Sequence, residues 1–165
     1  MPLLIAETVY GPTVGIYRET GRNDEAVTSY ATGVSTSLEQ SAFWLTKVRF
    51  ANARQRLSAT ASLPRGWDSY GAEAPNDIAR GLAAKVLNAL ETATLAPMRL
   101  TPTVEGGIAL SFVEAERRAV IEVYNTGEIA AAMYSDQGEP VVWEVESAEA
   151  ALLGSIEQIR VHLAA

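Results

Sequence analysis

The chain has 165 residues, no cysteine, one histidine and a formal net charge of −7 at pH 7. These numbers exclude disulfides, thiolate metal ligands, a cysteine nucleophile and any site built from several histidines. The length fits one ordinary domain or one domain with an arm, and the apolar content of 48% is close to the globular average.

The first residues, MPLLIAETVYG, lack the basic region, long apolar core and cleavage site of a secretory signal. No apolar run approaches the ~18 residues that a membrane-spanning helix needs. We therefore expect no membrane segment and a cytoplasmic location.

Residues 1–37 differ in composition from the rest of the chain. The segment TVYGPTVGIY predicts a short strand pair around Gly11 and Pro12, and the residues after it are rich in Ser, Thr, Gly and charge. They show neither a helical nor a strand period. The prediction is an N-terminal arm over residues 1–37, followed by a single α+β domain over residues 38–165.

A helix is predicted from about Leu38 to Ala59, with a capping box at Thr36 and Glu39 or at Ser37 and Gln40. A helix that is apolar on two faces needs two partners. One is expected to be the domain core; the other is the arm, a second subunit or a binding partner. The two predicted stripes are Trp44, Val48 and Ala51 on one side, and Phe43, Phe50 and Leu57 on the other.

Four basic residues on this helix raise the question of nucleic-acid contact. They point to two sides of the helix, and the protein is acidic overall. We therefore expect them to be solvated or paired within the chain: Lys47, Arg49, Arg54 and Arg56.

The loop LPRGWDSYGAEAPND, residues 63–77, sets two aromatic residues between two glycines. Trp67 and Tyr70 each combine an apolar body with a polar tip, which suits a contact surface. Asp68 can accept backbone hydrogen bonds within the turn, and Arg65 can stack on an aromatic ring. The loop is therefore either a recognition loop anchored by the two aromatics or an ordered plug across the junction of two helices.

The same loop resembles that of small uncharacterised bacterial and phage-borne proteins, which reads like Gly-Trp-Asp-Gly-Tyr-Gly-Ala. With the Ala/Leu-rich helix after it and the segment VEGGIALSF, the resemblance covers about residues 60–135. Ser69 stands where the resembled loop carries glycine. The resemblance implies the fold and a phage-related setting, without an activity. The matching positions are Gly66, Trp67, Asp68, Tyr70, Gly71 and Ala72.

A second helix is predicted from about Asp77 to Thr92, with Asn76 as its N-cap. Gly81 is expected to mark a close crossing with a neighbouring element. The predicted buried face consists of Ile78, Leu82, Val86, Ala89, Leu90 and Ala93.

From Met98 the apolar period changes to two, and five candidate strands follow with short, turn-like connections. They predict an antiparallel meander with one dry face, and with Pro102 on an edge strand. A last helix is expected after Ser147 as N-cap. The apolar stripe of that helix is Leu152, Ile156, Ile159 and Leu163.

The fold class is therefore α+β: a two-layer, five-stranded antiparallel meander packed against two to three helices, with an N-terminal arm. No catalytic set, metal site or cofactor site is predicted, and the single histidine, His162, is interpreted as structural. Nucleic acid is disfavoured as a partner.

The function hypothesis is a non-enzymatic protein–protein interaction or assembly component that binds another protein or a second copy of itself. The phage-related setting would make it a virion part, an inhibitor of host defence or an antitoxin-like partner. The alternative is a small-ligand-binding protein or a hydrolase that uses the Trp67–Tyr70 loop. The predicted partner-binding residues are Trp67, Tyr70, Arg65, Asp68, Trp44 and Val48.

Overall fold

The computed structural model describes residues 24–135 and 138–165, with side chains described from residue 40 onward in these ranges. The chain divides into two units, Met1–Ser37 and Leu38–Ala165. The strand pair predicted around Gly11 and Pro12 lies outside the described residues.

The first helix, α1, spans Asp24–Ala59 and leads into a short 3-10 helix, η1, at Thr60–Ser62. Its end agrees with the prediction, but its start does not. The helix begins at Asp24, inside the segment predicted as an arm over residues 1–37, and the predicted boundary after residue 37 coincides with the division between the two units. The capping box predicted around residues 36–40 is wrong, because it lies inside the helix. Extending an existing helix avoids a new nucleation step, and apolar residues recur in residues 24–37 at the i, i+3, i+4 and i+7 spacing of a helix. They are Val27, Tyr30, Ala31 and Val34.

Helix α2 spans Asp77–Thr92, as predicted, and the Asn76 side chain accepts a hydrogen bond from the Ala79 N–H at 2.9 Å. Its buried face is rotated from the predicted one, because Ile78 is 53% exposed. No atom lies within 4 Å of a Cβ built on Gly81, so the predicted close crossing there is wrong. The residues that α2 buries are Ala79, Ala83, Val86, Leu87, Ala89 and Leu90.

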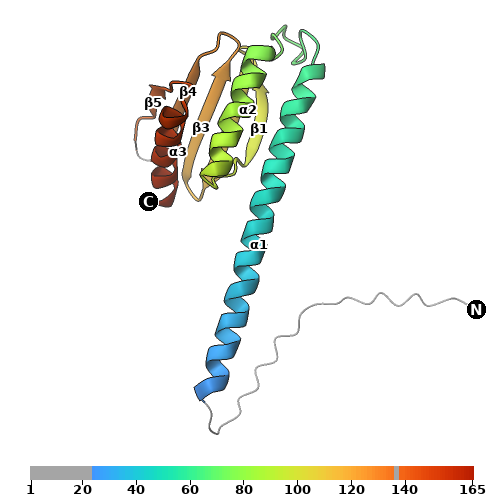
Figure 1. The fold of residues 1–165 in the computed structure, drawn as a ribbon. Helices are drawn as coiled ribbons and strands as arrows, with labels where there is room; N and C mark the ends of the chain where they lie inside the picture. Colours follow the sequence, from blue (N-terminus) through green and yellow to red (C-terminus); the bar gives the residue numbers. More distant parts are fainter. Residues whose placement is uncertain (1–23, 136–137) are drawn as a thin grey trace, which may run out of the picture. The chain divides into compact units, whose positions relative to one another are not determined.

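The five predicted strands form one antiparallel sheet in which each strand pairs with the next along the chain (Figure 1). The meander is therefore confirmed. Pro102 lies on the edge strand β1, opposite Ile108, as its missing N–H favours. The strands are β1 at Arg99–Thr103, β2 at Gly107–Glu114, β3 at Arg117–Tyr124, β4 at Ile129–Tyr134 and β5 at Val141–Glu144.

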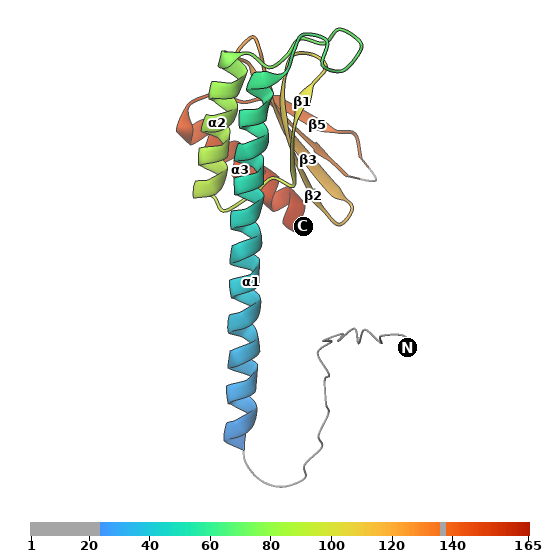
Figure 2. The same ribbon diagram turned by 90° about the vertical axis from the view of Figure 1, so that its right-hand side faces the viewer.

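Helices α2 and α3, the latter at Glu149–Ala164, cover one face of this sheet (Figures 1 and 2). The apolar residues that alternate along β2 and β3 are buried beneath them, so the predicted dry face is present there, whereas Val141 at the start of β5 is 56% exposed. Helix α3 buries Leu152, Ile156 and Ile159 as predicted. Its N-cap is Ala148 rather than Ser147.

The opposite face of the sheet is not covered by α2 or α3 (Figure 2). It carries polar residues such as Glu122 and Glu144, but small and apolar side chains lie among them. The strand register places on this face Ala109, Ser111, Val113, Val120, Ala130, Ala132 and Val142. Within the described ranges, no helix is both long and apolar enough to cross a membrane.

Candidate functional site

Four large apolar side chains stand exposed on two turns of α1. Phe43 is 58% exposed, Trp44 66%, Leu45 61% and Val48 53%. Phe43 and Trp44 meet edge to face, with ring centroids 6.1 Å apart and an interplanar angle of 74°. We call these four residues the α1 patch.

The same helix is buried along its other side. Phe50 and Ala53 are 3% and 4% exposed and belong to the core, and Leu57 packs against that core. At 100° per residue, Trp44 and Val48 lie roughly opposite these three. Phe43 was predicted to share the stripe of Phe50, but it is left outside the core.

Two basic residues fix α1 against α2 through a single carboxylate. The Arg54 guanidinium lies 2.6 Å from Glu91 and donates to Asn88 at 3.0 Å, and the Lys47 ammonium lies 3.6 Å from Glu91. The hydrogen bond from Arg54 holds the pKa of Glu91 below its ordinary value. Because these two basic residues are paired within the chain, as expected, they do not form a free phosphate-binding row. Arg49 and Arg56 make no ion pair with any residue that the structure describes.

The Trp67–Tyr70 loop is organised by one carboxylate oxygen. Asp68 Oδ1 accepts backbone N–H bonds from Tyr70 at 3.0 Å, Gly71 at 3.1 Å and Ala72 at 2.9 Å. These bonds, the one from Ala72 above all, lower the pKa of Asp68. The loop is closed by the Gly66 N–H, which donates to the Ala72 carbonyl at 2.8 Å. Asp68 therefore has the turn-forming role predicted for it.

The loop presents its two aromatic residues differently. Tyr70 is 94% exposed, so the alternative in which it plugs a junction between two helices is wrong. Trp67 is half-buried, and its indole N–H donates to the Glu73 carbonyl at 3.4 Å. Arg65 is exposed. Ser69 has φ = +69°, the left-handed conformation that glycine adopts without strain.

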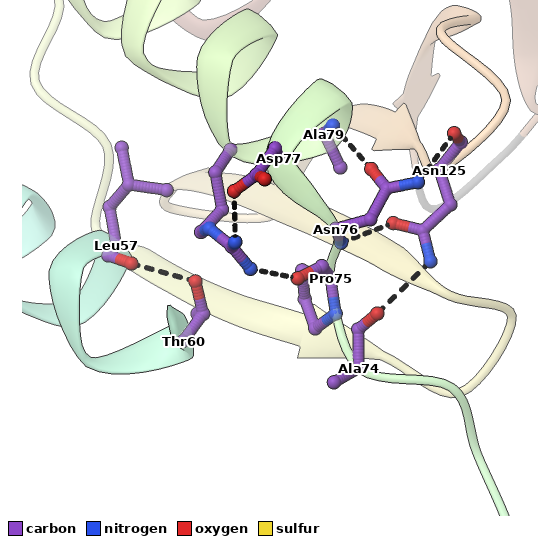
Figure 3. A network of polar contacts seen from close by, with 9 residues as sticks. Leu57, Thr60, Ala74, Pro75, Asn76, Asp77, Ala79 and Asn125 are labelled. Atoms are coloured by element: carbon purple, nitrogen blue, oxygen red, sulfur yellow. Dashed lines mark hydrogen bonds and ion pairs between the residues drawn. The ribbon is translucent and has the colours of Figure 1, made fainter. Parts of the chain in front are cut away.

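The end of the loop is tied to the turn between β3 and β4 (Figure 3). Asn125 Oδ1 accepts from the Asn76 N–H at 2.7 Å, and Asn125 Nδ2 donates to the Ala74 carbonyl at 3.0 Å. Asn76 Nδ2 donates in turn to the Asn125 carbonyl at 3.0 Å. Arg80 completes the network by donating to the Pro75 carbonyl and to the Asp77 carboxylate. The bonds of Asn125 fix the C-terminal end of the loop to the β3–β4 turn of the sheet.

The single histidine lies in a structural contact. His162 Nε2 is 3.1 Å from the Tyr134 carbonyl, and the His162 carbonyl accepts from Arg117 at 2.6 Å. Both contacts join the last turn of α3 to the end of the sheet. Within the described ranges, no three acidic or histidine side chains cluster as metal ligands would.

The six predicted partner-binding residues form two groups rather than one site. Trp44 and Val48 lie within the α1 patch, whereas Arg65, Trp67, Asp68 and Tyr70 lie in the loop. Between Trp44 and the end of α1 at Ala59 the helix rises about 22 Å. Sequence reasoning missed Leu45, although its position three residues before Val48 puts it on the same side of the helix.

Comparisons with protein-family models, with curated proteins and with solved structures found no match to this chain. The arrangement of its own side chains therefore carries the functional argument.

Proposed function

We propose that the protein is a non-enzymatic binding component that holds another protein, or a second copy of itself, on the α1 patch. The observation that carries the proposal is the exposure of Phe43, Trp44, Leu45 and Val48, each more than half exposed on two turns of one helix. Contiguous apolar surface of this kind on a folded protein marks interaction sites, whereas single exposed apolar residues are common.

The chemistry of the patch suits the centre of a protein interface. Tryptophan is among the residues that contribute most binding energy when a partner buries them. An amphipathic helix that lays its apolar side into a groove presents anchors three and four residues apart, and Leu45 and Trp44 precede Val48 by three and four residues. The burial of Phe50 and Ala53 in the core anchors the C-terminal half of the helix, which lowers the entropy lost on binding.

The Trp67–Tyr70 loop is the second contact in this proposal. Asp68 holds the backbone of the loop, so Tyr70 is presented to solvent by an ordered turn. A tyrosine on a rigid turn buries a large area at little entropic cost. The loop and the α1 patch lie too far apart to touch one small ligand, but one protein partner can span both.

A phage-related setting, as a virion part, an inhibitor of host defence or an antitoxin-like partner, is supported by the loop resemblance alone. The matching positions that carry it are Gly66, Trp67, Asp68, Tyr70, Gly71 and Ala72. The phage-related setting indicates in which organisms a partner should be sought. The proposed binding surface does not depend on this setting.

A hydrolase that uses the Trp67–Tyr70 loop is the less favoured function. The Asp68 oxygen that would act on a substrate already accepts three backbone N–H bonds. Its pKa is lowered, whereas a general base that works near neutral pH needs a raised one. Both features make Asp68 a weak base and a good structural residue.

The test is affinity capture from the native host, with Val48→Glu compared against Val161→Glu. Both valines lie on helices at similar exposure, 53% and 59%, so the two variants add the same charge to a similar surface. We expect a partner that the wild type and Val161→Glu retain and that Val48→Glu loses. The purified partner must then bind the wild type and not Val48→Glu in titration calorimetry.

Light scattering of the purified chain at rising concentration tests whether it binds a second copy of itself. The proposal predicts either a dimer that Val48→Glu dissociates or a heterologous partner with the same sensitivity. A chain that stays monomeric, together with captured proteins that Val48→Glu retains in full, would show that the α1 patch is not a binding surface.

A further inference from the structure

A hollow of about 660 Å³ lies at one end of the uncovered face of the sheet. Three arginines from three different elements line it: Arg56 of α1, Arg99 of β1 and Arg118 of β3. Among the lining residues that the structure describes, none carries a carboxylate. In a chain with a formal net charge of −7, this is a concentration of positive charge against the overall balance.

None of the three arginines makes a hydrogen bond or ion pair with another residue that the structure describes, and all three are exposed. Arg99 and Arg118 project from strands two positions apart in the sheet, about 10 Å, which two long side chains can bridge toward one ligand. Unpaired guanidinium groups around one hollow are preformed donors for a carboxylate, sulfonate or phosphate.

The strand register explains the apolar floor between these charges. Arg99, Ser111 and Val120 form one row across the sheet, and Val113, Arg118 and Tyr134 form the next. Val120 is half-buried, while Val113 and Tyr134 are 43% and 42% exposed. The hollow therefore offers an apolar surface with an aromatic ring beside its cationic groups.

The carboxylates on this face lie toward its other end. Glu122 and Glu144 share the row beyond Val120, on the side away from Arg118. Glu122 contributes, after burial, to the raised pKa of Tyr124 further along the same strand. The face is thus positive at one end and negative at the other, which orients a ligand whose anionic group meets the arginines.

We propose that this hollow binds a small organic anion: a carboxylate, sulfonate or phosphate ester attached to an apolar, flat body. The volume lies within the range of about 300–1,000 Å³ that small-molecule sites occupy. The guanidinium groups and the Ser111 and Tyr134 hydroxyls hold the anionic group, and Val113 and Val120 contact the apolar body. This site is separate from the α1 patch and does not depend on the partner proposed for it.

The test is an NMR titration of the full chain with 2-naphthoate, which joins a carboxylate to a flat apolar body. We expect saturable shifts of the Ser111 and Val120 amide resonances, with the Trp44 and Val48 amides unmoved. The neutral analogue 2-naphthamide should bind about tenfold more weakly or worse, because it lacks the charge-assisted hydrogen bonds. Inorganic phosphate, which lacks the apolar body, should also bind more weakly.

Variants assign the effect to the arginines. Arg99→Gln and Arg118→Gln should each weaken 2-naphthoate binding about tenfold, whereas Arg65→Gln in the loop should leave it unchanged. All three arginines are exposed, so the fold should survive each change, and circular dichroism checks this.

Four results would overturn the proposal. They are no saturable shift at Ser111 and Val120, equal binding of 2-naphthamide, equal binding of phosphate, or retention of full affinity in both arginine variants. A ten-residue peptide of alternating Glu and Leu is titrated in parallel. If the peptide saturates the hollow and 2-naphthoate does not, the surface takes an acidic protein segment and the small-molecule assignment is wrong.

Discussion

Asp68 shows how much one side chain can organise. A free aspartate oxygen is satisfied by water, but Asp68 Oδ1 collects three backbone donors from the four residues after it. Because the charged form makes these bonds, folding lowers the pKa, and the stabilising effect requires ionisation. The order of the loop, and with it the presentation of Tyr70, therefore depends on pH.

The sign of that dependence follows from the lowered pKa. The contribution of Asp68 is fully present above the ordinary pKa of 3.8 and is lost as the pH falls through the lower pKa of the folded state. In hydrogen exchange at neutral pH, Asp68→Ala should lose protection at the amides of residues 70–72, and Asp68→Asn should retain part of it. Glu73→Gln, next to the same turn, should exchange like the wild type. Equal protection in Asp68→Ala would mean that other contacts hold the loop.

Residue-scale expectations from local chemistry succeeded at two positions and failed at Ser147, since the N-cap of α3 is Ala148. The N-cap role of Asn76 and the turn role of Asp68 follow from side-chain reach alone, and both are confirmed. The contacts of Asn125 with Asn76 and Ala74 could not be predicted, because they join residues about 50 positions apart. Such contacts depend on how α2 is placed on the sheet.

At the scale of elements, the strands were predictable because period-two alternation and turn residues coincide with one buried face. The start of α1 was not, because the Ser, Thr and Gly residues of 24–37 are typical of irregular structure. The helical spacing i, i+3, i+4 and i+7 is present there, at Val27, Tyr30, Ala31 and Val34. The buried face of α2 was predicted in a rotated position. Small residues such as Ala79 and Ala83 let the helix approach the sheet closely, and a search for large apolar residues passes over them.

Replacing two glycines in different elements by alanine should change the free energy of unfolding in opposite directions. A Cβ on Gly107, at the start of β2, would lie 2.4 Å from the Val123 carbonyl oxygen of the paired strand. Because the neighbour is backbone, Gly107→Ala should lower the free energy of unfolding by more than about 2 kcal/mol. A Cβ on Gly81, inside α2, would have no neighbouring atom within 4 Å. Gly81→Ala should therefore raise the free energy of unfolding by about 0.5–1 kcal/mol.

Urea denaturation of both variants and the wild type provides the measurement. If Gly107→Ala unfolds at the same urea concentration as the wild type, β2 and β3 are further apart than the structure places them. A destabilised Gly81→Ala would show that α2 packs closely at that point after all.

At the scale of the whole molecule, the sequence predicted that α1 has more apolar surface than one layer can cover. It could not predict which stripe the core takes, because that depends on where α1 lies beside α2. Within the described residues, the core takes Phe50, Ala53 and Leu57 and leaves the α1 patch exposed. The proposed function depends on that division of the helix.

The most direct test of the proposed binding surface is whether the whole chain leaves Trp44 open to water. The emission of Trp44 is isolated as the difference between the full-length wild type and Trp44→Phe, which leaves Trp67 and Trp143 in place. It is measured in dilute, monomeric protein with iodide as quencher. We predict a red-shifted difference spectrum that iodide quenches nearly as well as free tryptophan, because the indole is 66% exposed. A blue-shifted difference spectrum that resists iodide in the monomer would show that the chain covers its own α1 patch, and would contradict the proposed function.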